Sequence, residues 1–448
     1  MATPSVSAHA TLAIVGGGPK AVAIAAMAHA VHAEGGPKID IKVFDHQGIG
    51  ANWGGATGYT DGEQRLCTFA ERDLGFPYAY EYLVTGAGTS AVSARLAREF
   101  SWQAFLAEQG NYALGEWVDD GRNRPLHSRF KGYLEWAFAK TGQQWFKDKV
   151  TSLAVASNRW VIHCNNDPTL PYGPYDGVVL TGPGPARLVK NVGNAPGKVF
   201  DGQDFWTSKP AVTTRLGLMK MKPPALEDSE KIVIVGAGGT AAAILGWLVE
   251  NGAAGLDIQV IAGSQAALHM RAENPFENRL FEDSMAWQAL KPETRRAFTG
   301  RLNRGVVWEA VLDRISHARN INVIEGFATK YVAVAGQPLE VHYEAYDPAP
   351  PATVPSKVML VGTAASLLID ASGFNDMWWT TLFPAGAALG TRGVLEDTLG
   401  DHLELRQGYW TKRPPLHAPM LSTMVGPGYA SLLSLGGMAE RILSNYGA

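Results

Sequence analysis

Two glycine clusters in this sequence have the residue types and spacing that bind phosphate. The first is Gly16-x-Gly18-x-x-Ala21, which follows an apolar run at residues 12–15 and precedes an alanine-rich stretch at 22–32. We expect Gly16 to permit a tight turn, Gly18 to let the backbone approach a pyrophosphate, and Ala21 to let helix and strand pack closely. Unpaired N–H groups at the helix N-terminus then favour an anion. This cluster predicts a strand, a dinucleotide-binding turn and a helix.

An acidic residue stands where the next strand should end. The apolar run at residues 39–44 stops at Asp45, which is well placed to accept hydrogen bonds from ribose hydroxyls. Residues 46–90, which include Trp53, are rich in Gly, Thr and aromatics and show no clear periodicity. They form either a surface loop or the wall of a cofactor pocket.

The second cluster repeats the first pattern 220 residues later. Residues 231–235 predict a buried strand, and Gly236-x-Gly238-Gly239-Thr240-Ala241 leads into a helix through residue 248. Another strand is expected at 257–262. Two such folds in one chain indicate two dinucleotides, which we interpret as a tightly held FAD and a diffusing NAD(P)H. The fold class expected is α/β, with two Rossmann-like domains.

Composition excludes several classes of function. The chain has 448 residues, enough for two or three domains, and a formal net charge of −3. This charge gives no case for binding nucleic acid or a membrane surface. Two cysteines form no motif, and the 11 histidines form no metal-binding motif. With no signal peptide and no membrane-length apolar run, we expect a cytoplasmic protein.

The sequence predicts that the second dinucleotide fold is inserted into the first. Residues 220–229 resemble a linker, and the apolar run 358–369 ends in Asp370-Ala-Ser-Gly373-Phe374, a signal that we assign to the first fold. The prediction is an FAD domain at 1–220 and 356–448, and an NADPH domain at 228–355. Near the C-terminus, residues 426–434 precede a predicted helix. Either their N–H groups face the flavin ring, or the segment simply leads into an ordinary C-terminal helix on the sheet.

Seven segments, in order along residues 12–440, resemble the flavin-dependent N-hydroxylating monooxygenases, which include the ornithine, lysine and diamine N-hydroxylases of siderophore synthesis. Pro-Phe-x-Asn is the most specific of them. The segments are Gly16-x-Gly18-Pro19, Arg72-Asp73-Leu74, Pro125-x-x-Ser-Arg129-Phe130-x-x-Tyr133-x-x-Trp136, Asn274-Pro275-Phe276-Glu-Asn278-Arg-Leu-Phe281, Leu302-Asn303-Arg-Gly-Val306-Val307, Asp370-Ala-Ser-Gly373-Phe374, and Gly428-x-x-Ser-Leu-Leu-Ser434.

The resemblance implies a reaction. NADPH would reduce FAD, O2 would give a C4a-hydroperoxyflavin, and a small amine or amino acid would be hydroxylated on nitrogen. No metal would be needed. The family also implies a homo-oligomer, by analogy a tetramer. The resemblance and the glycine motifs together give these cofactor-binding residues: Gly16, Gly18, Pro19, Ala21, Asp45, Trp53, Gly236, Gly238, Gly239, Thr240, Arg271, Gly373, Phe374, Ser431 and Leu432.

Four residues would bind the substrate by the same resemblance. Asn278 and Asn303 would line the pocket and act in catalysis, because an amide both donates and accepts hydrogen bonds. Arg72 stands where the family has a lysine, and Arg279 where it has a glutamate. These departures make the region more basic, so we expect an acidic substrate such as L-aspartate. Alternatively, either arginine pairs with Glu71, Glu277 or a cofactor phosphate.

Other functions remain open from the sequence alone. An ornithine, lysine or diamine N-hydroxylase keeps the family with a basic substrate. A Baeyer–Villiger or N/S-oxide-forming monooxygenase shares the two folds, although its Phe-x-Gly-x-x-x-His motif fails after Phe200. A non-enzymatic nucleotide sensor would keep the folds without the chemistry. Arg271 is the candidate for a contact with the 2′-phosphate, and such a contact would explain a preference for NADPH over NADH.

Overall fold

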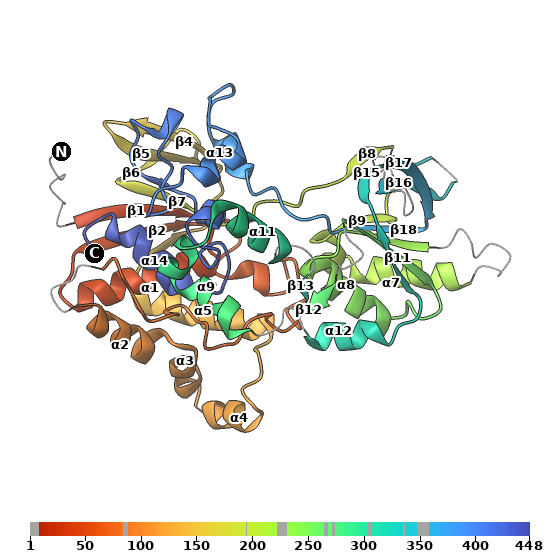
Figure 1. The fold of residues 1–448 in the computed structure, drawn as a ribbon, viewed down its shortest axis with the longest axis horizontal. Helices are drawn as coiled ribbons and strands as arrows, with labels where there is room; N and C mark the ends of the chain where they lie inside the picture. The colour runs from red at the N-terminus through yellow and green to blue at the C-terminus, as the bar shows by residue number, and fades with distance from the viewer. Residues whose placement is uncertain are drawn as a thin grey trace.

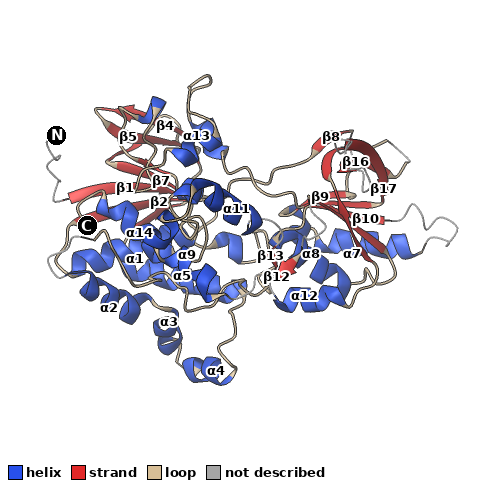
Figure 2. Ribbon diagram, in the orientation of Figure 1, coloured by secondary structure: helices blue, strands red, loops and turns tan. Residues whose placement is uncertain are grey.

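The computed structural model describes residues 9–83, 88–110, 112–193, 195–221, 231–263, 268–270, 274–302, 306–307, 309–334, 337–346 and 358–448. Two parallel sheets lie at opposite ends of its long axis, and helices cover their faces (Figures 1 and 2). No helix in these described ranges combines the length and apolar character needed to cross a bilayer.

The first sheet carries the first glycine cluster. Its strand order is β19-β7-β1-β2-β3. The side chains of Leu12, Ala13 and Ile14 in β1 are fully buried, as expected for a strand covered on both faces. The strands are β1 (His9–Val15), β2 (Lys38–Phe44), β3 (Gln144–Phe146), β7 (Gly177–Leu180) and β19 (Leu416–His417).

Helices on this sheet pack around α1. Every residue of α1 from Pro19 to Ala28 is buried, and the helix contacts α2, α5, α14 and β2. The helices of this half are α1 (Pro19–Ala33), α2 (Gly88–Phe100), α3 (Trp102–Glu108), α4 (Ala113–Asp119), α5 (His127–Thr141), α13 (Arg392–Asp397) and α14 (Leu435–Ser444), with 3-10 turns η1 (Ala51–Trp53), η3 (Trp378–Leu382), η4 (Gly408–Trp410) and η5 (Pro419–Met424).

The second sheet carries the second glycine cluster and has the order β14-β11-β10-β18-β9. Its strands are β9 (Val199–Asp201), β10 (Lys231–Val235), β11 (Asp257–Ala262), β14 (Ile321–Glu325) and β18 (Leu367–Asp370). The helices around it are α6 (Asp204–Thr207), α7 (Lys209–Lys220), α8 (Gly239–Glu250) and α12 (Glu309–Ser316). All of these elements lie between β7 and β19 in the chain, which is the order expected of an insertion.

The sheet assignment of residues 358–369 is a correction. The sequence assigned this run to the first fold, but β18 pairs with β10 and β9 in the second sheet. Residues 199–220, predicted with the first domain, likewise lie on the second sheet as β9, α6 and α7. The chain therefore crosses between the sheets near residues 181–199 and again after 370. An apolar run predicts a buried strand but does not say which sheet will bury it.

Two smaller sheets flank the parallel ones. The alternating residues 149–164 form an antiparallel hairpin that continues into β6. A four-stranded sheet beside the second fold has the order β17-β16-β15-β8. The strands are β4 (Val150–Ala156), β5 (Arg159–Cys164), β6 (Tyr172–Tyr175), β8 (Lys190–Val192), β15 (Phe327–Val332), β16 (Leu339–Tyr346) and β17 (Val358–Ala365), with the short pair β12 (His269–Met270) and β13 (Val306–Val307).

Three helices that lie between β11 and α12 in sequence contact the first half of the molecule. These are α9 (Pro275–Glu282), α10 (Ser284–Gln288) and α11 (Pro292–Leu302). The Arg295 guanidinium donates to the Met424 carbonyl in η5 at 2.9 Å. The Ser284 hydroxyl donates to the Glu81 carboxylate at 2.7 Å. These contacts bring residues 274–302 to the region between the two folds.

Candidate active site

The first glycine turn has the geometry that its sequence predicts. Gly16 has φ +105°, in the left-handed region, and a Cβ there would lie 2.5 Å from Thr181 Oγ1. Gly18 caps α1 in an extended conformation, with φ −79° and ψ −173°. A Cβ on Gly18 would meet no protein atom within 4 Å, whereas Ala21 is fully buried beneath the turn. The turn therefore leaves open space at the N-terminus of α1.

The second glycine turn repeats this geometry. Gly236 has φ +97°, and a Cβ there would lie 2.3 Å from the Ala371 carbonyl oxygen. Gly238 caps α8 with φ −83° and ψ −173°. Cβ atoms built on Gly238 and Gly239 meet nothing within 4 Å. Both turns thus present the N-terminus of a helix to empty space, where an anion is favoured.

One cavity connects the two turns. Its volume is about 1120 Å³, and it is lined by Gly16, Gly18 and Pro19 from the first turn and by Gly239 and Thr240 from the second. Pockets for drug-sized ligands span about 300–1,000 Å³, so this cavity is larger than one small substrate needs. The open space at both glycine turns fits an FAD on α1 and an NADPH on α8.

Asp45 lines the cavity at the end of β2, but its carboxylate first shapes the turn. Oδ2 accepts a hydrogen bond from the Gly17 N–H at 2.7 Å. Oδ1 accepts from the N–H groups of Gln47 at 2.8 Å and Gly48 at 3.1 Å. A ribose hydroxyl would have to share these oxygens, so the predicted ribose contact remains a prediction.

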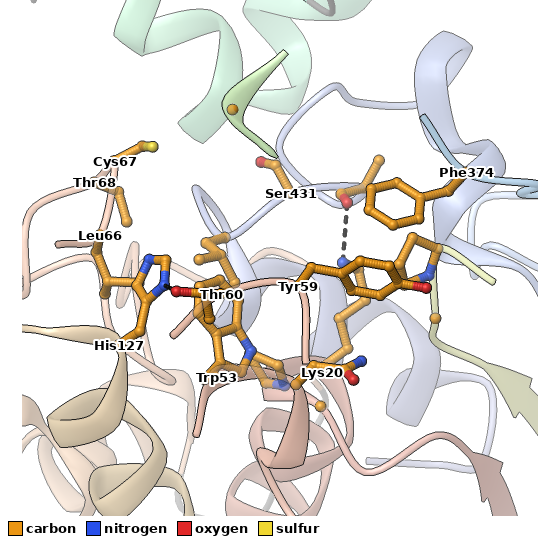
Figure 3. Close-up of a pocket in the computed structure, with 18 of the residues that line it drawn as sticks. Lys20, Trp53, Tyr59, Thr60, Leu66, Cys67, Thr68, His127, Phe374 and Ser431 are labelled. Carbon is orange, nitrogen blue, oxygen red and sulfur yellow. Dashed lines mark hydrogen bonds between the residues drawn. The ribbon is translucent and has the colours of Figure 1, made fainter. Parts of the chain in front are cut away.

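Trp53 forms part of the cavity wall together with residues that the sequence analysis did not identify (Figure 3). The His127 ring meets the Trp53 ring edge-on, with centroids 4.8 Å apart. His127 Nδ1 lies 3.0 Å from the Thr60 hydroxyl oxygen. Burial lowers the pKa of His127 to about 4, so the imidazole is neutral at pH 7. This wall therefore offers neutral hydrogen-bonding groups.

The opposite wall comes from the C-terminal segment. Ser431 and Leu432 line the cavity, as does Phe374, whose ring meets Tyr59 edge-on at 4.6 Å. Gly373 has φ +111° and its carbonyl accepts from the Arg187 N–H, so it places Phe374 without lining the cavity itself. The predicted cofactor residues Phe374, Ser431 and Leu432 therefore all face the space between the glycine turns.

A buried lysine was also missed. Lys20 lies just inside α1, lines the cavity, and donates from Nζ to the Ala430 carbonyl oxygen at 2.9 Å. Figure 3 shows this bond between two walls of the cavity. The available sequence signal was a lysine directly after Gly-Pro in a helix whose other residues are mostly small and apolar.

The two arginines expected to hold an acidic substrate do not form a basic pocket. Arg72 NH2 lies 2.9 Å from the Glu282 carboxylate, and its guanidinium stacks on the Phe76 ring at 4.7 Å. Arg279 Nε lies 3.2 Å from Asp283, and its side chain is 71% exposed. Each arginine is thus neutralised by an acid in its own neighbourhood. The partners differ from the Glu71 and Glu277 considered from sequence.

Of the other two predicted substrate residues, the structure describes Asn278 but not Asn303. Asn278 is half-buried on α9 and is not among the residues lining the cavity, whereas Phe281 on the same helix is. Asn303 and Arg271 lie outside the described residues, so their predicted roles remain predictions. Within the described ranges, no group of three or more His, Cys, Asp or Glu side chains could hold a metal ion.

Comparisons with known proteins identify the family of this chain. The L-lysine 6-monooxygenase/L-ornithine 5-monooxygenase family profile matches residues 92–318. L-lysine N6-monooxygenase MbtG of Mycobacterium tuberculosis is 32% identical, over 97% of this chain and 94% of its own. The same enzyme of Mycolicibacterium paratuberculosis is 31% identical, over 97% and 95%.

Solved structures show the same architecture. Lysine monooxygenase NbtG from Nocardia farcinica superposes with a TM-score of 0.75 at 27% identity, over 97% of this chain and 99% of its own. Ornithine N-hydroxylase KtzI of Kutzneria sp. 744 shares the fold, with a TM-score of 0.64 at 15% identity over 98% and 99%. The family resemblance and the α/β fold predicted from sequence are confirmed. This chain belongs to the L-lysine 6-monooxygenase/L-ornithine 5-monooxygenase family, the flavin-dependent N-hydroxylating monooxygenases that use FAD and NADPH.

Proposed function

We propose that this enzyme hydroxylates the side-chain amine of a basic amino acid, L-lysine or L-ornithine. The observation that carries the proposal is the single cavity that joins the two glycine turns. In this arrangement, a nicotinamide bound on α8 and a flavin bound on α1 would share one cavity with the substrate. The relatives are lysine enzymes by name, and this supports a basic substrate.

The expectation of an acidic substrate is therefore replaced by the alternative that the sequence left open. Its basis was the extra positive charge of Arg72 and Arg279. Since Glu282 and Asp283 pair with these arginines, the extra charge is cancelled locally. A cationic side chain meets no net repulsion there. The family also favours N-hydroxylation over the Baeyer–Villiger and non-enzymatic alternatives.

The chain's own residues bind and enclose the cofactors. The N-termini of α1 and α8 would hold the phosphates of FAD and NADPH, respectively. The flavin, when bound, supplies the activation of O2 with electrons from NADPH. Leu66, Phe281 and Met420 add apolar surface to the cavity wall. Such walls exclude water from the reacting groups and so protect a reactive oxygen species from hydrolysis.

We propose that the amino-acid head group binds near α9. Arg72 and Glu282 carry opposite charges 2.9 Å apart, which complements the carboxylate and ammonium of a zwitterion. Asn278 lies on the same helix as Glu282. With Asn303, it remains the candidate for hydrogen bonds to the substrate or nicotinamide. The cytoplasmic location and the tetrameric state remain predictions.

An amine panel tests the proposal. The FAD-loaded enzyme is given NADPH with lysine, ornithine, putrescine, cadaverine, aspartate or glutamate, and hydroxylamine and peroxide are both quantified. We expect hydroxylamine from lysine or ornithine. Hydroxylamine from aspartate would refute the proposal of a basic substrate. Peroxide alone from every amine would refute both the basic substrate and the N-hydroxylation of any amine in the panel.

A matched pair of arginine variants tests the head-group site. We expect Arg72→Ala to raise the KM for the accepted amino acid at least tenfold, because this side chain, only 10% exposed, would lose its charged hydrogen bonds to the substrate carboxylate. Arg279→Ala should leave the KM within twofold of the wild-type value, since this side chain is exposed and pairs with Asp283, the residue that caps its own helix. Equal effects of the two substitutions would show that Arg72 does not hold the substrate.

A further inference from the structure

One lysine lines the cavity, and no acidic side chain of the described residues pairs with it. Lys20 is the second residue of α1, and helix side chains tilt toward the N-terminus, which brings this one back over the glycine turn. The residue is only 8% exposed. It nevertheless belongs to the cavity lining (Figure 3).

The hydrogen bonding of this ammonium is incomplete. Nζ donates to the Ala430 carbonyl oxygen at 2.9 Å, and an ammonium has three donors. No carboxylate of the described residues lies within ion-pairing distance of Nζ. Burial therefore penalises the charge, and the pKa of Lys20 falls to about 8. A buried charge of this kind is costly unless an opposite charge joins it.

Other cations at the cavity lack this combination of features. Arg392 also lines the cavity, but it pairs with Asp376 and with Glu396, the latter at 2.9 Å. Arg65 reaches the cavity from an exposed position and donates to the Arg124 carbonyl. Arg124 lines the cavity too, but it is half-buried and its guanidinium stacks on the Phe69 ring at 4.3 Å. Of these four cavity cations, only Lys20 is buried, and its hydrogen bond goes to a neutral carbonyl group.

We infer that Lys20 is the binding residue for the negative charge of the flavin nucleotide and that its bond to Ala430 joins the bound flavin to the C-terminal loop, residues 427–433. The inference rests on the flavin site described above. The charge has two possible sources on one molecule, the diphosphate at the N-terminus of α1 or the flavin ring after reduction. Either source would complete the hydrogen bonding of the ammonium and offset its desolvation.

The first arm of the test measures affinity. Flavin-free wild type, Lys20→Met and Lys20→Arg are titrated with FAD and with riboflavin, and binding is followed by flavin fluorescence. Methionine keeps the length of the side chain and removes its charge. If the diphosphate is the partner, Lys20→Met weakens FAD binding at least tenfold, changes riboflavin binding less than twofold, and Lys20→Arg retains most of the FAD affinity.

The second arm measures the midpoint potential of the bound flavin. If the reduced ring is the partner, Lys20→Met leaves the affinity for oxidised FAD unchanged and lowers the potential. A tenfold loss of preference for the reduced ring corresponds to about 30 mV for a two-electron couple. Neither arm needs an amine substrate, so the result is independent of which amine the enzyme hydroxylates.

Control variants distinguish two roles of Lys20: binding the negative charge of the flavin nucleotide, and stabilising the fold through its hydrogen bond to Ala430. Lys140→Met removes a half-buried lysine that pairs with Glu108 and does not line the cavity; it should change neither readout. Wild-type affinity and wild-type potential in Lys20→Met would overturn the inference and leave Lys20 as a link to Ala430 only. Equal losses in Lys20→Met and Lys20→Arg would overturn it too, because charge would then not be the cause.

Discussion

The two glycine turns have nearly the same backbone and very different surroundings. Their capping glycines, Gly18 and Gly238, have φ within 4° of each other and the same ψ of −173°. The residues that follow differ: Pro19 and Lys20 are buried, whereas Gly239 is exposed and Thr240 half-buried. The same motif therefore builds one enclosed site and one open site.

Later segments of the chain account for this difference. The C-terminal loop, residues 427–433, reaches Lys20 through Ala430, and α1 is buried beneath α2, α5 and α14. The start of α8 has no comparable cover among the described residues. An enclosed site suits a cofactor that stays through many turnovers, and an open one suits a cofactor that must exchange. The following predictions test this comparison, beginning with the largest effect.

Filling the open space at each turn should remove a different cofactor. The extended backbone at Gly18 and Gly238 accepts any residue, and a Cβ there meets no protein atom within 4 Å, so we expect both valine variants to fold. Both should lose NADPH oxidation more than 100-fold. We expect Gly18→Val to purify without flavin, and Gly238→Val to keep FAD while anaerobic reduction by NADPH slows more than 100-fold. Loss of flavin from Gly238→Val would contradict the assignment of the two sites.

Lys20 and its counterpart Thr240 should differ in pH response. Burial lowers the pKa of Lys20 from 10.5 to about 8, so between these values the unfolded chain carries a proton that the folded apoprotein has lost. Stability of the apoprotein then rises with pH across this window. Between pH 7 and pH 10.5, the free energy of unfolding of the wild-type apoprotein should rise by about 3 kcal/mol relative to that of Lys20→Met. Urea unfolding measures this difference. Thr240→Val should show no such trend relative to wild type.

The left-handed glycines should matter to stability at both turns, and more at the second. Alanine at Gly16 would meet the Thr181 hydroxyl, which can rotate, whereas alanine at Gly236 would meet the Ala371 backbone carbonyl. We expect a loss of about 2 kcal/mol from each strained backbone, with Gly236→Ala the worse. Urea midpoints of the flavin-free variants measure this. A loss as large in Gly18→Ala would show that φ is not the cause.

The smallest effect should come from Asp45, because an amide can replace part of its function. Asp45→Asn keeps one acceptor for the N–H groups of Gly17, Gln47 and Gly48. We expect a loss of about 1 kcal/mol in stability and a severalfold weaker binding of FAD. Unchanged FAD binding with lowered stability would mean that Asp45 shapes the turn without touching the ribose.

Local features were predictable because they depend on neighbouring residues. The strand–turn–helix units at Gly16 and Gly236 follow from apolar runs and from glycines that accept φ near +100°. The Arg279–Asp283 pair is also local, four residues apart on one helix turn. That spacing is visible in the sequence, although Asp283 was not among the partners considered for Arg279 there.

Distant contacts were not predictable in the same way. Arg72 meets Glu282 across 210 residues, and Lys20 meets Ala430 across 410. His127 meets Trp53 and Thr60 only because α5 begins beside the loop at residues 60–68. The strand at Leu367–Asp370 joined the second sheet although its pattern would have suited either. No single sequence carries the pairing information for such contacts.

The two dinucleotide turns, their helices and the family could be predicted from the amino-acid sequence, because glycine conformation, hydrophobic periodicity and short motifs act over a few residues. Which charges remain available depends on the tertiary structure. It paired Arg72 with Glu282, left Lys20 with a neutral partner, and enclosed one turn while leaving the other open. A charge is neutralised or left uncompensated by whatever folds against it, and that depends on packing between segments hundreds of residues apart.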